Sequence, residues 1–279
     1  MTLCDVIVND ELHLVDLDIQ SRRVIDIHTG EEYDDYKVFV SYGTNDIYKL
    51  FYLQDKISFM YERHIENVRQ EYLVRKHDEI IKNVQSCELK ETDEYRDVAR
   101  INGLLSKEMC HRLNEYINDE FDNNRLKSSK ELTYAKKRFD MIVPNEGIVS
   151  EILKACLLKL NVDANKVTEI AVMINEPGST SQAFHPDYMD MELKTCFIAL
   201  QDVTEDMGPT QLIPNTNDKD TIDRFEHENR LGFPLNQPNV LGILNCGDAL
   251  IYHVQTIHRG TANTSTKRRN LFYFTYSLL

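Results

Sequence analysis

Ala183-Phe184-His185-Pro186-Asp187-Tyr188 is the stretch around which the chain is organised. Side chains alternate between the two faces of an extended strand, so His185 and Asp187 point to the same side and can bind one metal ion. A histidine and a carboxylate two residues apart occur by chance in many proteins. The spacing therefore gains its meaning from a second histidine motif about seventy residues downstream.

Length and composition restrict the class of protein. The 279 residues are 42% hydrophobic and 28% charged, with a formal net charge of −14, so the chain can build a large core. The negative charge argues against nucleic acid and against an anionic membrane surface as partners, because both require a basic face. The six cysteines are scattered without a Cys-x-x-Cys pair, which predicts reduced thiols in a reducing compartment.

The sequence also predicts where the protein works. Its first residues lack a basic leader followed by an apolar run, which is the pattern of a secretory signal. No stretch approaches the roughly 18 apolar residues that a membrane helix needs. We therefore expect a cytoplasmic protein without a membrane partner, whose oligomeric state the sequence leaves open.

Two regions follow one another along the chain. Residues 1–55 alternate and are rich in β-formers, which predicts a small set of antiparallel strands, and residues 56–85 change to the period of an amphipathic helix. Within that helix His64 and Glu66 diverge by about 200°, so they cannot share a metal ion. The polar segment 83–97 is the candidate linker. We expect a region of unknown role over 1–95, and a second domain over 96–279.

The second region mixes two helices with many short strands. Ser106 is the expected N-cap of a helix over 107–121, and we expect another helix over 148–160. From Thr168 onward, short apolar runs are separated by Pro, Gly and Asn turns. The fold class is therefore α+β with a mainly β core.

Three residues of this region form a possible metal-binding set: His185, Asp187 and His258. Two histidines and one carboxylate occupy one face of an octahedral ion and leave three positions open, which suits Fe(II) that binds a co-substrate and O₂. A zinc hydrolase uses the same residue types. The triad by itself leaves both metals open.

Arg269 begins the last predicted strand, over 269–277. Alternation places Arg269, Leu271 and Tyr273 on one face of that strand. If this face lines a cavity, the guanidinium needs an anionic partner there, and its planar fork matches a carboxylate. Alternatively Arg269 belongs to a solvent-exposed basic patch with its two preceding basic residues. The spacing favours neither reading.

Several motifs of the second region occur in a recognisable order: Pro177-Gly178-Ser179, His185-Pro186-Asp187, Leu200-Gln201-Asp202-Val203, Gly208-Pro209-Thr210, Gly247-Asp248, His253, His258 and Arg269. With them, residues 97–279 resemble the phytanoyl-CoA dioxygenase (PhyH-like) family of Fe(II)/2-oxoglutarate-dependent oxygenases. The resemblance implies a double-stranded β-helix, or jelly roll, with flanking helices and with the iron at its mouth. The N-terminal strands and helix lie outside it.

The resemblance also implies roles for individual residues. His185, Asp187 and His258 would be the metal ligands and catalytic centre, and Arg269 would bind the distal carboxylate of 2-oxoglutarate. Lys137 stands where family members place a second cationic contact to the co-substrate, and Arg138 is an equal candidate for that contact.

Four further positions follow from the same comparison. Phe197 stands where many members have a tryptophan beside the co-substrate. Gly260 stands where some members offer a hydroxyl, so that contact is absent or comes from Thr261. His253 matches a frequent family histidine, to which we assign no metal role. We expect surface positions for the remaining histidines: His13, His28, His64, His77, His111 and His227.

The implied activity is hydroxylation of a small-molecule substrate, with O₂ and 2-oxoglutarate consumed and succinate and CO₂ formed. Ascorbate would serve as a reductant. Related halogenases have a small residue at the position of Asp187, so the retained carboxylate favours hydroxylation. Two alternatives remain: a cupin-type metalloenzyme that does not use 2-oxoglutarate, and a non-catalytic relative that binds a metal or a partner.

Overall fold

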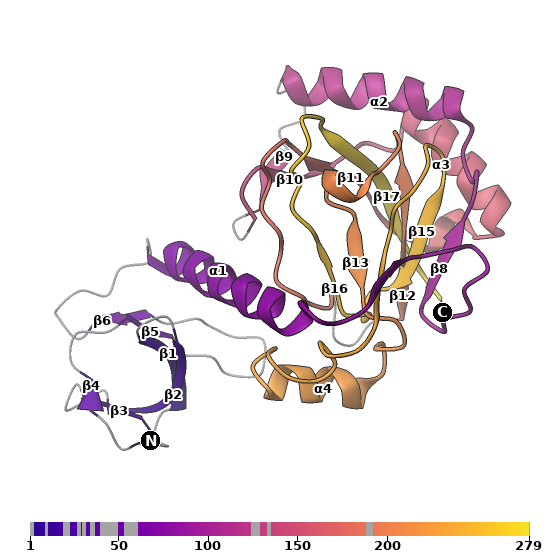
Figure 1. Ribbon diagram of the computed structural model, residues 1–279. Coiled ribbons are helices and arrows are strands. Elements are labelled where there is room, and N and C mark those ends of the chain that lie inside the picture. The colour runs from indigo at the N-terminus through magenta and orange to yellow at the C-terminus, as the bar shows by residue number, and fades with distance from the viewer. Residues whose placement is uncertain are drawn as a thin grey trace. The chain divides into compact units, whose positions relative to one another are not determined.

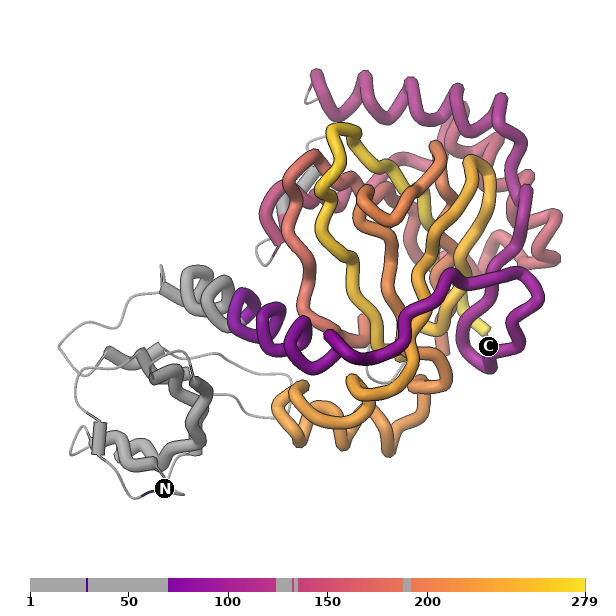
Figure 2. Tube along the Cα trace, in the orientation of Figure 1, coloured from indigo at the N-terminus to yellow at the C-terminus, as the bar shows by residue number. Residues whose placement is uncertain are grey.

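The computed structural model describes the backbone of some residues alone, and the backbone together with the side chains of others. The backbone is described over residues 3–8, 11–18, 23–26, 29, 32–33, 37–39, 50–52, 61–123, 129–132, 135–187 and 192–278. Side chains are described at residues 29, 70–123, 132, 135–187 and 192–278. Figure 2 colours the chain by this distinction. The chain divides into two compact units, residues 1–72 and 73–279.

The first unit contains an antiparallel sheet of short strands. In spatial order it comprises β4 (Glu32–Tyr33), β3 (Arg23–Asp26), β2 (Glu11–Asp18), β1 (Leu3–Val8), β5 (Lys37–Phe39) and β6 (Leu50–Tyr52). The long hairpin of β1 and β2 follows the alternating pattern of the sequence, which confirms the predicted strands. The role of this region stays a prediction.

A long helix, α1 (Tyr61–Ile81), follows these strands and continues past residue 72 into the second unit. Residues 64 and 66 lie in this helix, and their side chains lie outside the described ones. The expected linker over 83–97 is instead part of the second unit. There β7 (Ser86–Glu88) pairs in parallel with β14 (Asn239–Leu241). Backbone pairing needs no apolar period, which explains why this polar segment resembled a linker.

Two sheets form the core of the second unit. The seven-stranded sheet has the order β8 (Val98–Ile101), β15 (Ala249–His253), β12 (Leu193–Ala199), β17 (Arg269–Ser277), β11 (Val167–Asn175), β10 (Arg138–Ile142) and β9 (Ser129–Glu131). The four-stranded sheet has the order β16 (His258–Gly260), β13 (Thr210–Leu212), β14 and β7. These sheets form the expected jelly roll, and Figure 1 shows their strands.

The outer face of the seven-stranded sheet is covered by two helices, α2 (Lys107–Asp122) and α3 (Gly147–Leu160). Their buried residues share one core with the outward-facing residues of β12 and β17, such as Ile198 and Phe274. Ser106 caps α2 as predicted, since its side chain accepts a hydrogen bond from the Met109 N–H. The predicted helices are therefore confirmed.

The inner face of the same sheet belongs to a second core. Phe197, Leu271 and Tyr273 lie there together with Leu212 and Val240 of the four-stranded sheet. Residues of one strand thus alternate between the helix-covered core and this inner core, as the pattern of residues 269–277 predicts.

A fourth helix, α4 (Lys219–His227), lies in the region where we expected only short strands. Its Asp218 N-cap accepts a hydrogen bond from Thr221 N–H, but only Ile222 and Phe225 are buried. Two apolar positions are too few for a readable helical period. Among the described helices, none is long and apolar enough to cross a membrane.

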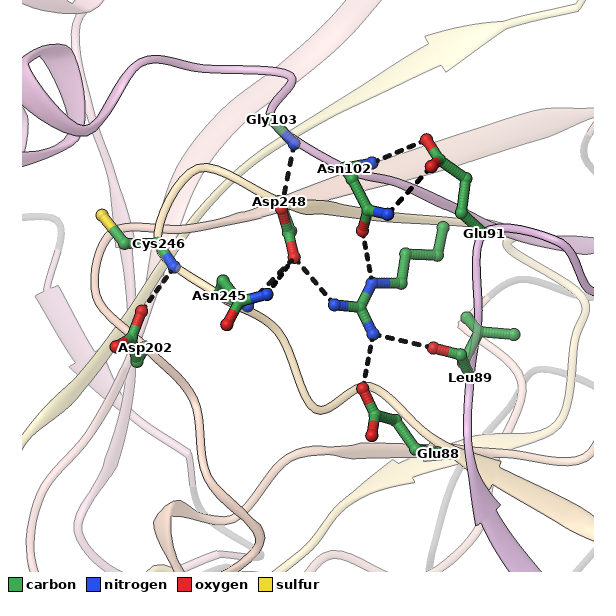
Figure 3. A network of polar contacts seen from close by, with 10 residues as sticks. Glu88, Leu89, Glu91, Asn102, Gly103, Asp202, Asn245, Cys246 and Asp248 are labelled. Carbon is green, nitrogen blue, oxygen red and sulfur yellow. Dashed lines mark hydrogen bonds and ion pairs between the residues drawn. The ribbon is translucent and has the colours of Figure 1, made fainter.

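The Gly247-Asp248 turn joins β15 to β8 and to the start of α2. Gly247 has φ +93°, and a Cβ there would approach the Leu105 carbonyl oxygen to 2.2 Å, so only glycine fits. Asp248 is 4% exposed and accepts hydrogen bonds from Gly103 N–H and from Arg100 Nη2, at 2.9 and 2.8 Å (Figure 3). The motif therefore has a structural role.

We predict that Asp248→Asn lowers the free energy of unfolding at pH 7 by about 3 kcal/mol, because Arg100 then keeps only Glu88 as an ionic partner. Burial opposes ionisation of Asp248, but the hydrogen bonds from Gly103 and Arg100 hold its pKa below the usual value. Its contribution is therefore present above the unfolded pKa and is lost as the pH falls through the folded one.

Urea unfolding at pH 7 and at pH 3 measures this effect. The loss caused by Asp248→Asn should shrink at pH 3, where the carboxylate contributes less. Glu151→Gln is the control, because the Arg112–Glu151 pair is about half exposed on both sides and should contribute little to stability. Equal losses for the two variants would contradict the structural role of Asp248.

Candidate active site

Two backbone hydrogen bonds bring the histidine motifs together. His185 N–H donates to the His258 carbonyl at 2.9 Å, and His258 N–H donates to the His185 carbonyl at 3.0 Å. The pair is an isolated antiparallel bridge, so His185 lies in an extended segment with one bridge to β16 and not in a full strand. Tyr188, the last residue of the opening stretch, lies outside the described residues.

The three predicted ligands converge at this bridge. The Nε2 atoms of His185 and His258 lie 3.8 and 3.5 Å from Asp187 Oδ1. One ligand atom from each residue lies within 4.8 Å of the others, and this is the group that could hold a metal ion among the residues with described side chains. The structure thus brings the predicted triad together.

Both histidines are fixed in the tautomer that a metal needs. His185 Nδ1 lies 2.8 Å from the Ala183 carbonyl oxygen, and His258 Nδ1 lies 2.9 Å from the Thr256 carbonyl oxygen. A carbonyl oxygen only accepts, so each Nδ1 carries the proton and each Nε2 presents a lone pair. Hydrogen bonds of this kind orient metal-binding histidines.

Burial favours the neutral form of both rings. It lowers the pKa of His185 to about 4, helped by the proximity of His258, and it lowers the pKa of His258 to about 4 as well. Both imidazoles are therefore neutral at physiological pH. Neutral imidazoles beside a carboxylate suit a divalent cation such as Fe(II), so the donor set fits the metal that the resemblance implies.

Tyr252 completes this polar group and was missed from the sequence. Its hydroxyl donates to Asp187 Oδ2 at 3.1 Å, and its oxygen lies 3.3 Å from His258 Nε2. Burial, and then the neighbouring Asp187 carboxylate, raise the Tyr252 pKa, so the hydroxyl stays protonated. The signal that could have identified it is alternation on the strand 249–253, which places Tyr252 on the inner face.

The triad opens into a cavity of about 280 Å³ between the two sheets. Arg269, Leu271, Tyr273 and Thr275 all line it, so these residues share one face of β17, as alternation predicts, and the structure shows that this face points inward. Arg269 is 1% exposed, which excludes the surface-patch reading. Its Nη1 donates to the Gly208 carbonyl, and its Nε is buried without a hydrogen-bond partner among the described residues.

Arg138, and not Lys137, is the second cation of the cavity wall. Arg138 is 1% exposed, lines the cavity and donates from Nη2 to the Thr261 carbonyl at 2.7 Å. Lys137 is exposed and donates from Nζ to the Pro177 carbonyl at 3.2 Å. Lys137 has a φ of +57° and forms a turn before β10. The Lys137 side chain is exposed there, whereas the Arg138 side chain is buried.

Gly260 gives Arg138 its room. A Cβ at residue 260 would lie 2.2 Å from Arg138 Nη1. The guanidinium therefore fills the space that a hydroxyl-bearing side chain would take. Thr261 does not replace that hydroxyl, since its Oγ1 donates to the Pro209 carbonyl at 2.9 Å.

The two arginines lie in one row across three strands. Asn175 of β11 pairs directly with Arg138 of β10 and with Arg269 of β17. Both amide atoms of Asn175 are buried without a hydrogen-bond partner among the described residues. Burial, and then the charge of Arg138, lower the pKa of Arg269 well below its usual value. Such a row is stabilised by an anionic ligand.

Aromatic rings line the same cavity as the two arginines and the triad. Phe197 lines the cavity and stacks on Tyr252, with ring centroids 5.8 Å apart, and it meets Tyr273 edge to face at 5.1 Å. The wall beyond them is polar: the Tyr273 hydroxyl donates to Asp140 Oδ1 at 3.0 Å. Burial, and then Asp140, raise the pKa of the nearby Glu169.

The other histidines have different environments. His253 is buried outside the triad and lies 3.4 Å from a Glu192 carboxylate oxygen, in keeping with the absence of an assigned metal role. His111 and His227 are exposed as expected. The surface prediction is wrong for His77, which is fully buried. His13, His28 and His64 lie outside the described side chains.

Comparison with known proteins agrees with this geometry. A family model for phytanoyl-CoA dioxygenase (PhyH) matches residues 98–271. No curated protein sequence matches the chain.

Three solved structures share the fold. HygX from Streptomyces hygroscopicus, solved with nickel and 2-oxoglutarate bound, has a TM-score of 0.51 at 13% identity, over 65% of this chain and 82% of that one. AviO1 from Streptomyces viridochromogenes Tue57 gives 0.51 at 15% identity, over 66% and 90%. SnoK, a non-haem alpha-ketoglutarate-dependent carbocyclase from nogalamycin biosynthesis, gives 0.50 at 17% identity, over 64% and 79%.

At identities this low, the structural similarity shows a common fold and nothing more. The family match extends over more than half of the chain. The protein therefore belongs to the phytanoyl-CoA dioxygenase (PhyH) family of iron- and 2-oxoglutarate-dependent oxygenases.

Proposed function

We propose that the protein hydroxylates a small molecule in a reaction that depends on Fe(II), 2-oxoglutarate and O₂. The observation that carries this proposal is the pair of histidines whose Nδ1 protons are held by backbone carbonyls, with both Nε2 atoms turned toward Asp187. Three protein ligands on one side of an ion leave positions for a co-substrate and O₂.

In this proposal His185, Asp187 and His258 hold the iron, which supplies the oxidising chemistry when it is bound. The Tyr252 hydroxyl holds Asp187 Oδ2 and thereby fixes the orientation of the carboxylate. The aromatic wall of Phe197 and Tyr273 keeps water from the cavity beside the triad. The retained Asp187 favours hydroxylation over halogenation.

Arg269 and Arg138 would bind the distal carboxylate of 2-oxoglutarate. Two guanidinium groups in a buried site are costly without an anion, and a carboxylate accepts from such a fork in two parallel hydrogen bonds. The Asn175 amide in the same row offers a further donor and acceptor. Lys137 stands outside the cavity, so we assign the second cationic contact to Arg138.

The substrate would meet the polar wall that carries Asp140, Glu169 and Thr275. A small molecule with hydrogen-bond donors fits carboxylates in this position. Ascorbate would act as an external reductant. Product analysis with candidate substrates distinguishes hydroxylation from other outcomes of the same oxidising centre.

We predict that His258→Ala abolishes Fe(II)-dependent turnover of 2-oxoglutarate, because the variant keeps only two of the three proposed metal ligands. The measurement is succinate formation by purified protein with Fe(II), ascorbate and 2-oxoglutarate, which we expect to proceed slowly even without substrate. His111→Ala is the control, since this exposed histidine lies outside the site. Wild-type protein that neither forms succinate nor binds 2-oxoglutarate in an anaerobic iron titration would contradict the proposed function.

We also predict different effects for the cations near the cavity. Arg269→Ala and Arg138→Met should each weaken 2-oxoglutarate binding by about 30-fold, or about 2 kcal/mol, because each removes a charge-assisted hydrogen bond. Lys137→Met should leave that affinity within about twofold, as expected for an exposed charge.

Anaerobic calorimetric titration of the metal-loaded protein measures these affinities, and metal affinity is followed in parallel. Both arginine variants should keep their affinity for the metal. A loss of metal and 2-oxoglutarate binding to the same extent would instead indicate a folding defect. A larger effect of Lys137→Met than of Arg138→Met would reverse the assignment of the second cation.

A further inference from the structure

Two consecutive residues of α1 contact the residues that flank the proposed histidine ligands. His77 Nδ1 accepts a hydrogen bond from Phe184 N–H at 3.0 Å, and Phe184 immediately precedes His185. Asp78 Oδ1 lies 2.8 Å from Nη1 of Arg259, which immediately follows His258. One helical turn therefore reaches both segments that carry the triad histidines.

The contacts lie on the back of these segments. Because His185 and His258 are directly opposite in an antiparallel bridge, Phe184 and Arg259 are neighbours on the face away from the histidines. The Arg259 guanidinium carbon lies 4.6 Å from the Phe184 ring centroid, and both residues are buried. The end of α1 thus contacts the two segments on the face that points away from the histidines.

His77 uses both of its ring nitrogens. A backbone N–H only donates, so Nδ1 is the acceptor, and Nε2 must donate to the Arg230 carbonyl oxygen, which lies 2.7 Å away. Burial lowers the His77 pKa to about 3, so the ring stays neutral. The His77 ring thus makes one hydrogen bond toward the triad, at Nδ1, and one away from it, at Nε2.

A core-filling histidine would explain the burial of His77 but not the contact made by the next residue. Asp78 is 54% exposed in its side chain, yet it pairs with an arginine that is 5% exposed. Each of the two residues reaches a different histidine-bearing segment. The helix also precedes the part of the chain that the family model matches, which begins at residue 98.

We infer that His77 and Asp78 are positioning residues of the metal centre, an inference that rests on the proposed function. His77 fixes the peptide that leads into His185, and Asp78 anchors the side chain that follows His258. Together they hold the two imidazoles at a constant separation before the metal binds. Ligands that are already in place lose less freedom on binding, so the metal binds more tightly.

Two substitutions of His77 separate this role from ordinary packing. In His77→Asn the amide can occupy the place of Nδ1 and accept from Phe184 N–H, whereas in His77→Gln the longer amide can occupy the place of Nε2 and donate to the Arg230 carbonyl. Each variant loses one buried hydrogen bond, so both should lose similar thermal stability. Only His77→Gln loses the bond toward the triad.

The experiment is an anaerobic titration of the full chain with Co(II), followed by its visible absorption bands. We expect His77→Gln to weaken Co(II) binding at least about tenfold and to change the band shape, as disturbed orientation of metal ligands does. His77→Asn should keep both the wild-type spectrum and the wild-type affinity. Thermal unfolding of the metal-free proteins checks that the two variants are equally folded.

Asp78 has its own matched control in the next residue. Asp78→Asn should weaken Co(II) binding several-fold, since the buried Arg259 loses its ionic partner. Glu79→Gln should leave the titration unchanged, because Glu79 is 55% exposed and its ion pair among the described residues is a local one with Lys76. Equal effects of these two variants would overturn the role of Asp78.

The remaining outcomes are also distinct. Equal Co(II) affinity of wild type and His77→Gln overturns the positioning role while leaving the metal centre intact. Equal weakening by His77→Gln and His77→Asn overturns it as well, because the effect then follows stability. The third outcome is that wild-type protein shows no Co(II) site that is lost in His258→Ala. That outcome overturns the proposed function, and this inference with it.

Discussion

The site depends on the reciprocal pair of backbone hydrogen bonds between His185 and His258. These bonds join the segment after β11 to β16, and they bring together residues that are distant in sequence. The same extended geometry lets each imidazole donate from Nδ1 to the carbonyl two residues before it. One local backbone arrangement therefore sets the proximity, the tautomer and the direction of both rings. Asp187 then follows from alternation along its segment.

A second constraint is electrostatic. Arg269 and Arg138 are both buried, and their mutual proximity contributes to the low pKa of Arg269. A folded chain tolerates such a pair where an anion can enter, and the row through Asn175 shows how the sheet register creates that place. The cavity thus has a cationic end, the two histidines with Asp187, and a polar wall with Asp140 and Glu169. Its polarity arises from the order of residues along the inward-facing strands.

The sequence was sufficient where a rule of local geometry applied. Alternation identified which residues of β17 share a face, and the capping and period of residues 106–121 identified α2. It was insufficient where the decisive partner is distant or the backbone departs from regular geometry. The left-handed turn at Lys137 hides that Arg138 is the inward residue, and the burial of His77 depends on the backbone of Phe184 and Arg230. Segment 83–97 appeared to be a linker because the parallel pairing of β7 leaves no apolar pattern.

The close approach of Arg138 to Gly260 has a consequence for how this site can change over time. The guanidinium and any side chain at residue 260 compete for one volume, so the two positions behave as a single unit. A larger residue at 260 is tolerated only after residue 138 has shortened, and a shortened residue 138 leaves a gap that a larger residue at 260 can fill. A hydroxyl-bearing residue at 260 is therefore expected to fit this chain only when residue 138 is replaced together with it.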